Sequence, residues 1–330
     1  MKKFLTIAGA RPNLIKLDNK LKQVLVWTGQ HYDKEMKDIF FSGLKLPKPK
    51  YDLGVTELGE MTDKISKIIE KEKPDYVIVY GDTRSALAGA MSAYYNNVKV
   101  IHIEAGMRSG NDNMIEERIR KIIDDIACIH FTVCQEDKEN LEMDYKKTQV
   151  YNVGAVQIDT MRKSVFPTKL PKDAYKYSVL TIHRDFNVNK ENLEEIFSAL
   201  ETWGKKVEFY CHPRTALFIK KNKLELPKNI TILPPCSYKQ MINRLAYAER
   251  VLTDSGGIQL EAYYLRRPCV TLRYDTEWHE TANSGWNFLT GPSKERILLA
   301  LNNNIRGKGE WEYYGVGKAK ENIRLYLENL

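Results

Sequence analysis

The sequence predicts an α/β protein in which two doubly wound parallel sheets are covered by helices. Short runs rich in Val, Ile, Leu, Thr and Tyr recur along the chain and alternate with longer segments of helical period. The short runs are apolar at consecutive positions, as in parallel strands that are buried on both faces. At 330 residues the chain is also too long for one comfortable core, so two domains are expected.

Short apolar runs bounded by polar or Gly-containing turns are typical of buried strands. We expect strands at Phe4–Ala8, Val24–Thr28, Tyr76–Tyr80, Val100–Ile103, His130–Val133, Val150–Val153, Ser178–Ile182, Val207–Cys211, Ile230–Leu233, Val251–Thr253 and Cys269–Leu272. Segments with apolar residues at helical spacing lie between them. We expect helices at Met61–Lys71, Arg84–Tyr95, Glu116–Ala127, Glu191–Trp203, Tyr238–Ala248, Ile258–Leu265 and Gly317–Leu330.

A change in composition near the middle of the chain indicates where the two domains meet. The segment Met161–Tyr177 contains Pro167 and Pro171 and few apolar residues, which is typical of a linker. We expect a Rossmann-like N-terminal domain of residues 1–158, completed by residues 316–330, and a Rossmann-like C-terminal domain of residues 159–315. The two domains would face each other across a cleft.

The net charge of +8 does not by itself indicate a nucleic-acid partner. The lysines are spread along presumed helix faces, and their densest clusters lack interleaved aromatic residues and any nucleic-acid motif. A basic surface around an anionic small molecule explains the charge equally well. No run approaches ~20 uninterrupted apolar residues, so neither a membrane span nor a membrane partner is expected.

The N-terminus reads as a first core strand, because Arg11 and Pro12 follow the short apolar run at once and leave no room for a signal peptide. The five cysteines are scattered, odd in number and without C-x-x-C spacing. Most lie in or beside apolar segments, where a free thiol packs as a small hydrophobe. We therefore expect structural thiols and a cytoplasmic protein.

Polar residues gather where the predicted strands end, which is where open parallel sheets bind ligands. In the first half these positions hold Gly9–Pro12, Gly29–His31, Gly81–Thr83 and Glu104–Gly106, and in the second half His183-Arg184, His212–Arg214, Asp254–Gly257 and Arg273. Three of the six histidines, His31, His183 and His212, directly follow an apolar strand. A merely structural sheet would scatter such residues, so this arrangement indicates a site.

The two halves differ in the kind of polar group they offer. The first half places the carboxylates Asp82, Glu104, Glu116 and Glu117 around Arg11 and Lys16, whereas the second half offers His, Arg and Gly-rich backbone donors with one later acid, Glu261. Clustered carboxylates push at least one pKa upward, which suits a general acid or base near neutral pH. The pattern suggests a substrate with a phosphate part and a part that undergoes proton transfer.

The clearest phosphate signal is the turn Asp254–Gly257. It joins the apolar run Val251–Thr253 directly to the helical segment that begins at Ile258. A helix that starts in this way presents unpaired backbone N–H groups at the positive end of its dipole, which favours an anion. The alternative is that Gly256 and Gly257 only make a sharp turn between strand and helix.

Each residue also has a structural interpretation. Asp82 could cap the helix that begins near Thr83, and Glu116 and Glu117 would offset a helix dipole in any case. His102 and His130 lie within strands and are expected to be packed core residues. No metal-ligand spacing occurs, so no metal is predicted. The dinucleotide fingerprint G-x-G-x-x-G is absent after the first strand, which argues against a tightly bound dinucleotide.

Taken in order, these segments resemble the non-hydrolysing UDP-N-acetylglucosamine 2-epimerases over nearly the whole chain. The branch that acts on UDP-2,3-diacetamido-glucuronic acid is included in that resemblance. The matching segments are Gly9–Pro12 with Ile15-Lys16, Thr28–His31, Gly81–Thr83, His102–Ser109, Glu116-Glu117, His183-Arg184, Leu252–Gln259 with Glu261-Ala262, and Thr276-Glu277.

The resemblance implies a glycosyltransferase-B-like fold and inversion of carbon 2 of a UDP-N-acetylhexosamine, from UDP-GlcNAc to UDP-ManNAc. The reaction would eliminate UDP to a glycal and add it back, without a cofactor. A cytoplasmic homodimer in polysaccharide biosynthesis is also implied. The implied catalytic residues are Asp82, Glu104, Glu116 and His183. The residues expected to bind substrate are Arg11, Lys16, His31, Arg108, Glu117, His212, Arg214, Ser255, Gly256, Gly257, Glu261 and Arg273.

The chain also departs from the family pattern. The segment between Lys16 and Val24 is short, with room for about two helical turns, and Asn113–Ile115 stands where Pro-Trp-Pro is frequent. Phe186 replaces a usual Glu, and Tyr32-Asp33 alters the allosteric pattern.

These departures and the sequence itself leave four alternatives open. One is a 2-epimerase of the diacetamido uronate, because Arg108-Ser109, His212–Thr215 and Thr276–Trp278 look like that branch. Another is a hydrolysing epimerase that releases free sugar and UDP. The remaining two are a retaining glycosyltransferase of the same fold and a non-catalytic nucleotide-sugar-binding protein.

Overall fold

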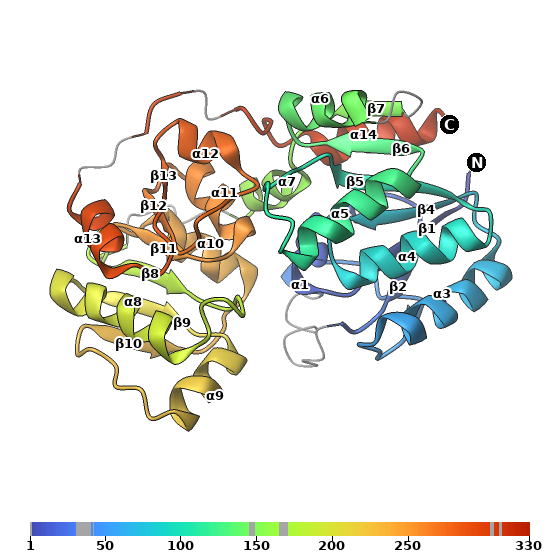
Figure 1. Ribbon diagram of the computed structural model, residues 1–330. Coiled ribbons are helices and arrows are strands. Elements are labelled where there is room, and N and C mark those ends of the chain that lie inside the picture. The colour runs from blue at the N-terminus through green and yellow to red at the C-terminus, as the bar shows by residue number, and fades with distance from the viewer. Residues whose placement is uncertain are drawn as a thin grey trace. The chain divides into compact units, whose positions relative to one another are not determined.

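Each half of the chain folds around its own parallel sheet (Figure 1). The computed structural model describes residues 2–30, 41, 43–144, 149–164, 171–303, 307–309 and 312–330. Two compact units divide it: unit 1 comprises Met1–Arg162 with Tyr313–Leu330, and unit 2 comprises Lys163–Glu312. Every strand pairing is parallel, so the predicted α/β class with two doubly wound sheets is confirmed.

The sheet of unit 1 has seven strands in the order β3-β2-β1-β4-β5-β6-β7. This order grows outward in both directions from β1 and β4, as in a doubly wound fold. The strands are β1 (Phe4–Ala8), β2 (Val24–Trp27), β3 (Tyr51–Asp52), β4 (Tyr76–Tyr80), β5 (Lys99–Ala105), β6 (Ile129–Thr132) and β7 (Gln149–Asn152).

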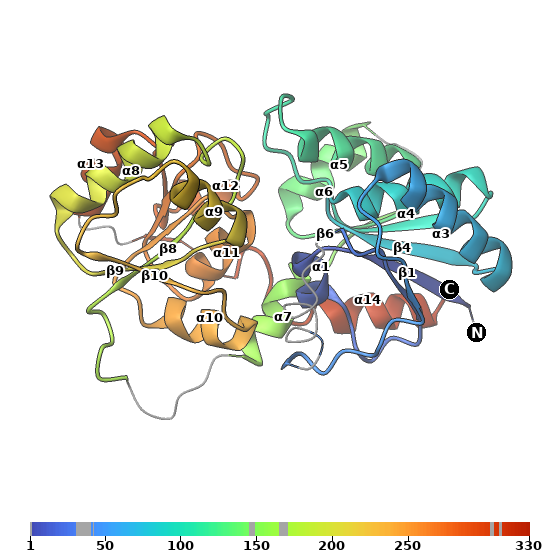
Figure 2. The ribbon, with the colours of Figure 1, turned by 90° about the horizontal axis from the view of Figure 1, so that it is seen from below.

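The helices of unit 1 cover both faces of this sheet. Figure 2 shows α3, α4 and α5 on one face and α1, α7 and α14 on the other. Their bounds are α1 (Arg11–Lys16), α3 (Leu58–Glu72), α4 (Arg84–Tyr95), α5 (Ile115–Ile126), α6 (Gln135–Asp144), α7 (Val156–Arg162) and α14 (Ala319–Glu328).

The core of unit 1 forms because helix and strand present apolar side chains at matching periods. In α3, Met61, Ile65 and Ile69 recur at the spacing of one helix face and are at most 3% exposed. They pack in one cluster with Val77 and Val79 of β4. Burying each such side chain contributes roughly 1.5–3 kcal/mol before the entropy of ordering is subtracted.

The C-terminal helix α14 packs within unit 1, beside segments far from it in sequence. The carboxylate of Asp159 accepts hydrogen bonds of 3.1 Å from the backbone N–H groups of Ala319 and Lys320, at the start of the helix. The ring of Tyr326 contacts those of Phe131 and Tyr151, with centroids 5.4 and 4.3 Å away. The end of the chain therefore completes the first unit.

Unit 2 repeats the plan with six strands in the order β10-β9-β8-β11-β12-β13. Helices α8 and α13 pack together on one face, and α10 contacts α11 on the other (Figure 1). The strands are β8 (Ser178–Thr181), β9 (Val207–Tyr210), β10 (Ile230–Leu233), β11 (Val251–Thr253), β12 (Cys269–Thr271) and β13 (Asn287–Leu289). The helices are α8 (Lys190–Trp203), α9 (Pro213–Lys221), α10 (Tyr238–Ala246), α11 (Gly256–Tyr264), α12 (His279–Asn283) and α13 (Lys294–Asn302).

The predicted strands all occur, with ends that differ by one or two residues, and the predicted helices all occur with similar small differences. Two edge strands are additional: β3 has two residues and β13 begins with a polar Asn, so neither gives an apolar run. Between Lys16 and Val24, where about two helical turns had room, the chain forms turns and loop instead.

Candidate active site

Some of the predicted site residues, among them Asp82 and His183, lie in loops where strand order reverses in each sheet. In unit 1, β1 and β4 are neighbours, and the loops after them begin at Gly9 and Gly81. In unit 2, β8 and β11 are neighbours, and the loops after them carry His183 and Asp254. Such reversal points are where open α/β sheets bind ligands.

Glu104 is a buried carboxylate on a strained backbone. The register of β5 against β6 shifts between Ile103 and Ala105, and Glu104 between them has φ +67°. A left-handed φ at a non-glycine residue costs about 1–3 kcal/mol and is typical of functional sites. Glu104 is 4% exposed, and its Oε2 pairs with Nζ of Lys16. Among the described residues its Oε1 has no hydrogen-bond partner, so that oxygen is available to a ligand.

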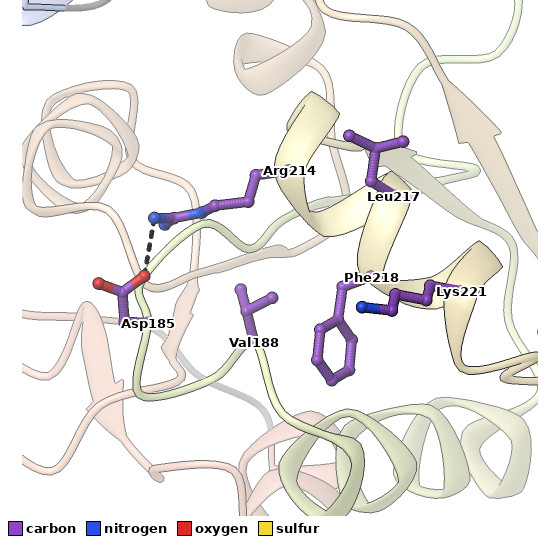
Figure 3. A pocket seen from close by; sticks show the side chains of 6 residues that line it. All are labelled: Asp185, Val188, Arg214, Leu217, Phe218 and Lys221. Carbon is purple, nitrogen blue, oxygen red and sulfur yellow. Dashed lines mark ion pairs between the residues drawn. The ribbon is translucent and has the colours of Figure 1, made fainter.

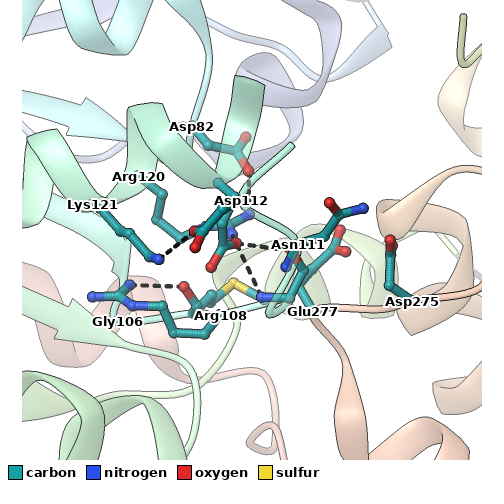
Figure 4. Close-up of polar contacts among 12 residues, drawn as sticks. Asp82, Gly106, Arg108, Asn111, Asp112, Arg120, Lys121, Asp275 and Glu277 are labelled. Carbon is teal, nitrogen blue, oxygen red and sulfur yellow. Dashed lines mark hydrogen bonds and ion pairs between the residues drawn. The ribbon is translucent and has the colours of Figure 1, made fainter. Parts of the chain in front are cut away.

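Asp82 does not cap the helix that follows it, so that structural interpretation is wrong. The cap of α4 is Thr83, whose Oγ1 accepts a hydrogen bond of 3.1 Å from the N–H of Ala86. The carboxylate of Asp82 instead accepts from Nη2 of Arg120, as Figure 4 shows. Arg120 is 2% exposed, so a desolvated cation holds this carboxylate from α5.

The same guanidinium ties a second acid into the cluster. Nη1 of Arg120 donates to Oε2 of Glu117, which is fully buried in the first turn of α5. That oxygen also accepts from the backbone N–H and the hydroxyl of Ser109, at 3.0 and 2.9 Å. Glu117 therefore fixes Arg120 and the loop before α5. Glu116, its neighbour, is half-buried in the same turn.

Arg108 and His102 share one partner, the buried carboxylate of Asp124. Nη1 of Arg108 lies 2.7 Å from Asp124 Oδ2, and Nδ1 of His102 lies 2.7 Å from Asp124 Oδ1. His102 is fully buried, as expected of a core residue, but it is hydrogen-bonded rather than merely packed. Arg108, predicted to bind substrate, is held here by a carboxylate of its own unit.

In unit 2, His183 is held by another buried carboxylate. Asp254 is fully buried and lies 3.0 Å from Nδ1 of His183. It also accepts hydrogen bonds from the backbone N–H groups of His183 and Arg184 and from the amide of Asn187. Burial raises the pKa of Asp254, but the charge and hydrogen bond of His183 and the other donors lower it to about 2. The ring of His183 is thereby oriented, as general acids and bases require.

His212 and Arg214 form the start of α9 beside this loop. Nδ1 of His212 caps the helix by accepting from the N–H of Arg214 at 3.3 Å, and Pro213 occupies the first helical position. The rings of His183 and His212 lie 6.3 Å apart. Arg214 donates to the carbonyl of His183 and pairs with Asp185 at 2.7 Å.

A shallow pocket of about 370 Å³ opens beside Arg214 (Figure 3). Apolar side chains form its floor, and the Arg214–Asp185 pair stands at one side. It is lined by Asp185, Val188, Arg214, Leu217, Phe218 and Lys221. Among the predicted site residues, Arg214 lines this pocket, whereas His183 and His212 do not.

The turn after β11 opens a helix as predicted. Ser255 is the residue before the first helical turn of α11, and its N–H donates to Thr253 Oγ1 at 2.9 Å. At Gly256 a Cβ atom would lie 2.1 Å from Oε1 of Glu277 and 3.3 Å from Nε1 of Trp278, so a larger residue would require the Glu277 side chain to move. The first turn of α11 places its backbone N–H groups at the positive end of the helix dipole, where an anion is favoured.

Two further predicted residues of unit 2 are buried and hydrogen-bonded. Glu261, in α11, accepts a hydrogen bond of 3.0 Å from the hydroxyl of Tyr238. Arg273 lies between Asp275 and Glu277, with its Nη2 2.6 and 2.9 Å from their carboxylates. Burial lowers the pKa of Arg273, but the two acids more than offset this and raise it.

The structure thus divides the predicted residues that it describes into two groups, one in each unit. A Cβ on Gly81 would lie 3.1 Å from Glu104 Oε2 and 3.4 Å from Lys16 Nζ, so the Glu104 carboxylate lies against the residue before Asp82. His31 lies outside the described residues, and nothing is described of the Arg11 side chain. Group one holds Lys16, Asp82, Glu104, Arg108, Glu116 and Glu117, and group two holds His183, His212, Arg214, Ser255, Gly256, Gly257, Glu261 and Arg273.

Comparison with known proteins identifies the family. The model of the UDP-N-acetylglucosamine 2-epimerase family matches residues 13–328, which is nearly the whole chain. This chain belongs to the UDP-N-acetylglucosamine 2-epimerase family. A UDP-N-acetylglucosamine 2-epimerase homolog of Methanococcus maripaludis is 38% identical over 99% of this chain and 100% of its own.

Two further relatives are similar to this chain over nearly its whole length. The UDP-2,3-diacetamido-2,3-dideoxy-D-glucuronate 2-epimerase of Pseudomonas aeruginosa is 36% identical over 99% of this chain and 100% of its own. The crystal structure of Methanocaldococcus jannaschii UDP-GlcNAc 2-epimerase, in complex with UDP-GlcNAc and UDP, superposes with a TM-score of 0.91. It is 34% identical over 99% of this chain and 100% of that one.

Two buried side chains of this epimerase-family member were not predicted as site residues: Arg120 and Asp124. Asp254 was expected only as part of the phosphate-binding turn, and its contact with His183 was not predicted. Arg120 and Asp124 alternate with Ile119 and Ile123 on the buried side of α5. Charged residues beside the apolar positions of a helix were the available signal, since buried charges are paired or functional. Within the described parts of the chain, no three His, Cys, Asp or Glu side chains gather as a metal site, and no helix is long and apolar enough to cross a bilayer.

Proposed function

We propose that this protein inverts carbon 2 of UDP-N-acetylglucosamine, giving UDP-N-acetylmannosamine, without hydrolysing the sugar from UDP. The observation that carries the proposal is the buried Glu104 carboxylate, held beside Lys16 on a left-handed backbone with Oε1 available to a ligand. A strained, desolvated carboxylate suits proton transfer. Membership of the 2-epimerase family supplies the substrate class.

The proposed reaction proceeds by elimination and re-addition. One carboxylate among Asp82, Glu104 and Glu116 takes the proton from carbon 2 while the bond between carbon 1 and the UDP oxygen breaks, leaving a glycal. UDP then adds back to carbon 1, and a proton is delivered to carbon 2 on the opposite face. A carbon-bound proton is weakly acidic, so its removal must be coupled to loss of a stabilised leaving group.

Unit 2 would provide that stabilisation. The turn Ser255–Gly257 at the N-terminus of α11 would hold the diphosphate through backbone N–H groups of the first helical turn, and Glu261 would contact the ribose. His183, oriented by Asp254, would stabilise the departing diphosphate. Arg273 adds a buried cation in the same unit. Lys16 and Arg11 of unit 1 would contribute further positive charge to the UDP.

A second substrate is supported by one specific observation. The Pseudomonas aeruginosa relative, named for UDP-2,3-diacetamido-2,3-dideoxy-D-glucuronate, is 36% identical over 99% of this chain, and the UDP-N-acetylglucosamine 2-epimerase of Methanocaldococcus jannaschii is 36% identical over 97% of it. That substrate carries a carboxylate at carbon 6, and its recognition needs a cation beside the sugar. The two substrates would undergo the same chemistry at carbon 2, so the acid group does not distinguish them.

The proposal is tested by incubating the protein in heavy water with each UDP-sugar in turn. We expect one of the two to acquire deuterium at carbon 2 and to form its 2-epimer, observed by NMR. Deuterium in neither sugar contradicts the proposal. Free sugar and UDP in equal amounts, in place of the UDP-linked epimer, would instead assign a hydrolysing epimerase. Glu104→Gln serves as the inactive reference.

We propose in addition that the protein works in the cytoplasm as a homodimer. Its five cysteines are free thiols, as expected of a reducing compartment. Helices α4 and α5, which contact each other, expose large apolar side chains: Met91, Tyr94, Tyr95 and Ile122 are 40–85% exposed. Sedimentation should show a dimer that Tyr95→Glu dissociates and that Leu299→Glu, at an exposed apolar position of unit 2, leaves intact.

A further inference from the structure

We propose that Asp124, acting with His102, is a positioning residue that holds the Asp82 and Glu104 carboxylates in place. The inference rests on the proposed function, because those two carboxylates are the acids of the proposed reaction. Neither Asp124 nor His102 needs to contact the substrate. Both act through the backbone of two glycines, Gly81 and Gly106, that flank the acids in sequence.

Asp124 lies at the centre of a set of donors and is fully buried in α5. Its Oδ1 lies 2.7 Å from His102 Nδ1, and its Oδ2 lies 2.7 Å from Arg108 Nη1. Both oxygens also accept, at 3.3 Å, from the backbone N–H of Gly106. One carboxylate thus joins β5, the loop after it and α5.

His102 links Asp124 to the end of the neighbouring strand, β4. Its Nε2 lies 3.0 Å from the carbonyl oxygen of Gly81, at the end of β4. The ring is fully buried, so it has carboxylate on one side and carbonyl on the other, with no water to compete. The His102–Asp124 pair therefore spans from the residue before Asp82 to the residue two after Glu104.

Both glycines are held at each of their backbone polar groups. The N–H of Gly81 donates to the carbonyl of Ile103 at 2.8 Å, and the carbonyl of Gly81 is the group that His102 holds. The carbonyl of Gly106 accepts a hydrogen bond of 3.0 Å from the amide of Asn140, and the N–H of Gly106 is the group that Asp124 holds. At Gly106, with φ +79°, a Cβ would lie 2.2 Å from the carbonyl oxygen of Asp137, so this backbone cannot shift toward α6.

This anchor explains how the strained Glu104 persists. A left-handed residue in a bulge relaxes unless its surroundings determine its conformation. On the N-terminal side Ile103 is held by Gly81, and on the C-terminal side Gly106 is held by Asp124. Removing the Asp124 acceptor frees one side of the bulge, and the Glu104 carboxylate then loses its fixed position beside Lys16.

The charge of Asp124 matters as well as its shape. Burial raises the pKa of this carboxyl, but the hydrogen bond and charge of His102 and the charge of Arg108 more than offset it, so the pKa is lowered. All its partners are donors. An Asn in its place would turn an NH₂ group toward at least one of His102, Gly106 or Arg108, and that contact would be lost.

The kinetic test uses Asp124→Asn, His102→Gln and the double variant. We expect kcat to fall by about 10- to 100-fold in each single variant while KM and the affinity for UDP alone stay within about two-fold, as for a misplaced catalytic group. Because the two residues form one unit, the double variant should lose little more than the more affected single variant. Unchanged kcat in both single variants overturns the proposal.

The matched control is Glu72→Gln. Glu72 is also a buried carboxylate of unit 1, 6% exposed, but it pairs with Lys3, Lys50 and Tyr51 near the other ends of the strands. It should lower the melting temperature while kcat stays at the wild-type value. A kcat loss in Glu72→Gln equal to that in Asp124→Asn would reduce the effect to general destabilisation and overturn the proposal.

A second readout needs no activity and so separates this inference from the proposed function. Amide hydrogen exchange at Gly106 should accelerate at least ten-fold in Asp124→Asn, and exchange at Gly81 should accelerate in His102→Gln, relative to Glu72→Gln. If wild-type protein places no deuterium on either UDP-sugar while Gly106 still responds, the proposed function fails and the anchoring stands. Unchanged protection at Gly106 overturns the anchoring, even in an active enzyme.

Discussion

Nδ1 of His183 lies 3.0 Å from Oδ1 of Asp254, a carboxylate that is wholly shielded from solvent. Asp254 also holds the backbone of the loop that carries His183, so one side chain fixes both the ring and its support. The first loop of unit 2 is therefore organised from the strand beside it, across the β8–β11 pair.

Replacing Asp254 by Ala should damage both stability and activity. The donors that now meet a buried charge would be left unsatisfied, which costs on the order of 3 kcal/mol or about 6–12 °C in Tm for a unit of this size. His183 would lose its fixed orientation, so kcat should also fall. Calorimetry and initial rates check both effects. Asp173→Ala, whose carboxylate is 44% exposed and pairs with Arg244, should cost less than about 1 kcal/mol.

Arg120→Lys should not behave as a conservative change. The guanidinium bridges Asp82 and Glu117 with two different nitrogens, and a lysine offers one point charge in place of that fork. We expect kcat to fall by about 10- to 100-fold with UDP affinity retained. Titration calorimetry with UDP separates the two quantities. Arg118→Lys on the same helix, where the side chain is exposed, should keep full activity.

Gly256→Ala should weaken UDP binding. The added methyl carbon would lie 2.1 Å from Oε1 of Glu277, so either that side chain or the first turn of α11 must move. We expect at least a ten-fold rise in the Kd for UDP, measured by calorimetry. Gly59→Ala in α3, where a Cβ meets nothing within 4 Å, should leave binding unchanged and raise stability by about 1 kcal/mol. Equal affinity in the two variants would contradict the prediction.

Asp137 should make the protein less stable as the pH rises. Burial is the main cause that raises the pKa of this carboxyl from 3.8 to about 7. A carboxyl that holds its proton more tightly when folded contributes stability at low pH and loses that contribution as pH rises from about 4 to about 7. Across that range the free energy of unfolding falls by at most about 1.4 kcal/mol for each rise of one in pH.

The variant Asp137→Asn keeps a neutral side chain at every pH and tests this directly. Its melting temperature should equal that of wild type below about pH 4 and exceed it increasingly up to about pH 8. Asp125→Asn, at an exposed position of α5, should have a melting temperature that follows wild type across the whole pH range. A wild type that stays as stable as Asp137→Asn at pH 8 would show that the carboxyl ionises at no cost.

The two sheets could be predicted from the sequence because they depend on local patterns. Apolar runs such as Tyr76–Tyr80 form strands wherever they can be covered, and the polar residues at their ends must then meet at one edge of a sheet. The short edge strands β3 and β13 could not be predicted in this way. β13 begins with Asn287, whose amide bonds to Gln259 and Thr281 of other elements, and no local pattern encodes those contacts.

The residues that hold the site in place also could not be predicted from the sequence. Nothing in the run Ile103–Ala105 indicates a bulge, because Glu104 acquires its left-handed backbone from pairing with two different neighbours. Arg120 and Asp124 look like ordinary charges of an amphipathic helix. Their function as anchors depends on which face of α5 turns inward, and this is decided by packing against the sheet.

The backbone of Glu104 has a consequence for any attempt to make this protein more robust. At φ +67° glycine is the residue that fits without strain, so the conformation that presents the carboxylate is one that a side chain makes costly. Glycine would relieve this strain, but it would also leave the largely buried Lys16 ammonium without its carboxylate partner. The ion pair therefore offsets the cost of the left-handed backbone, and a more stable variant must keep an acid at this position.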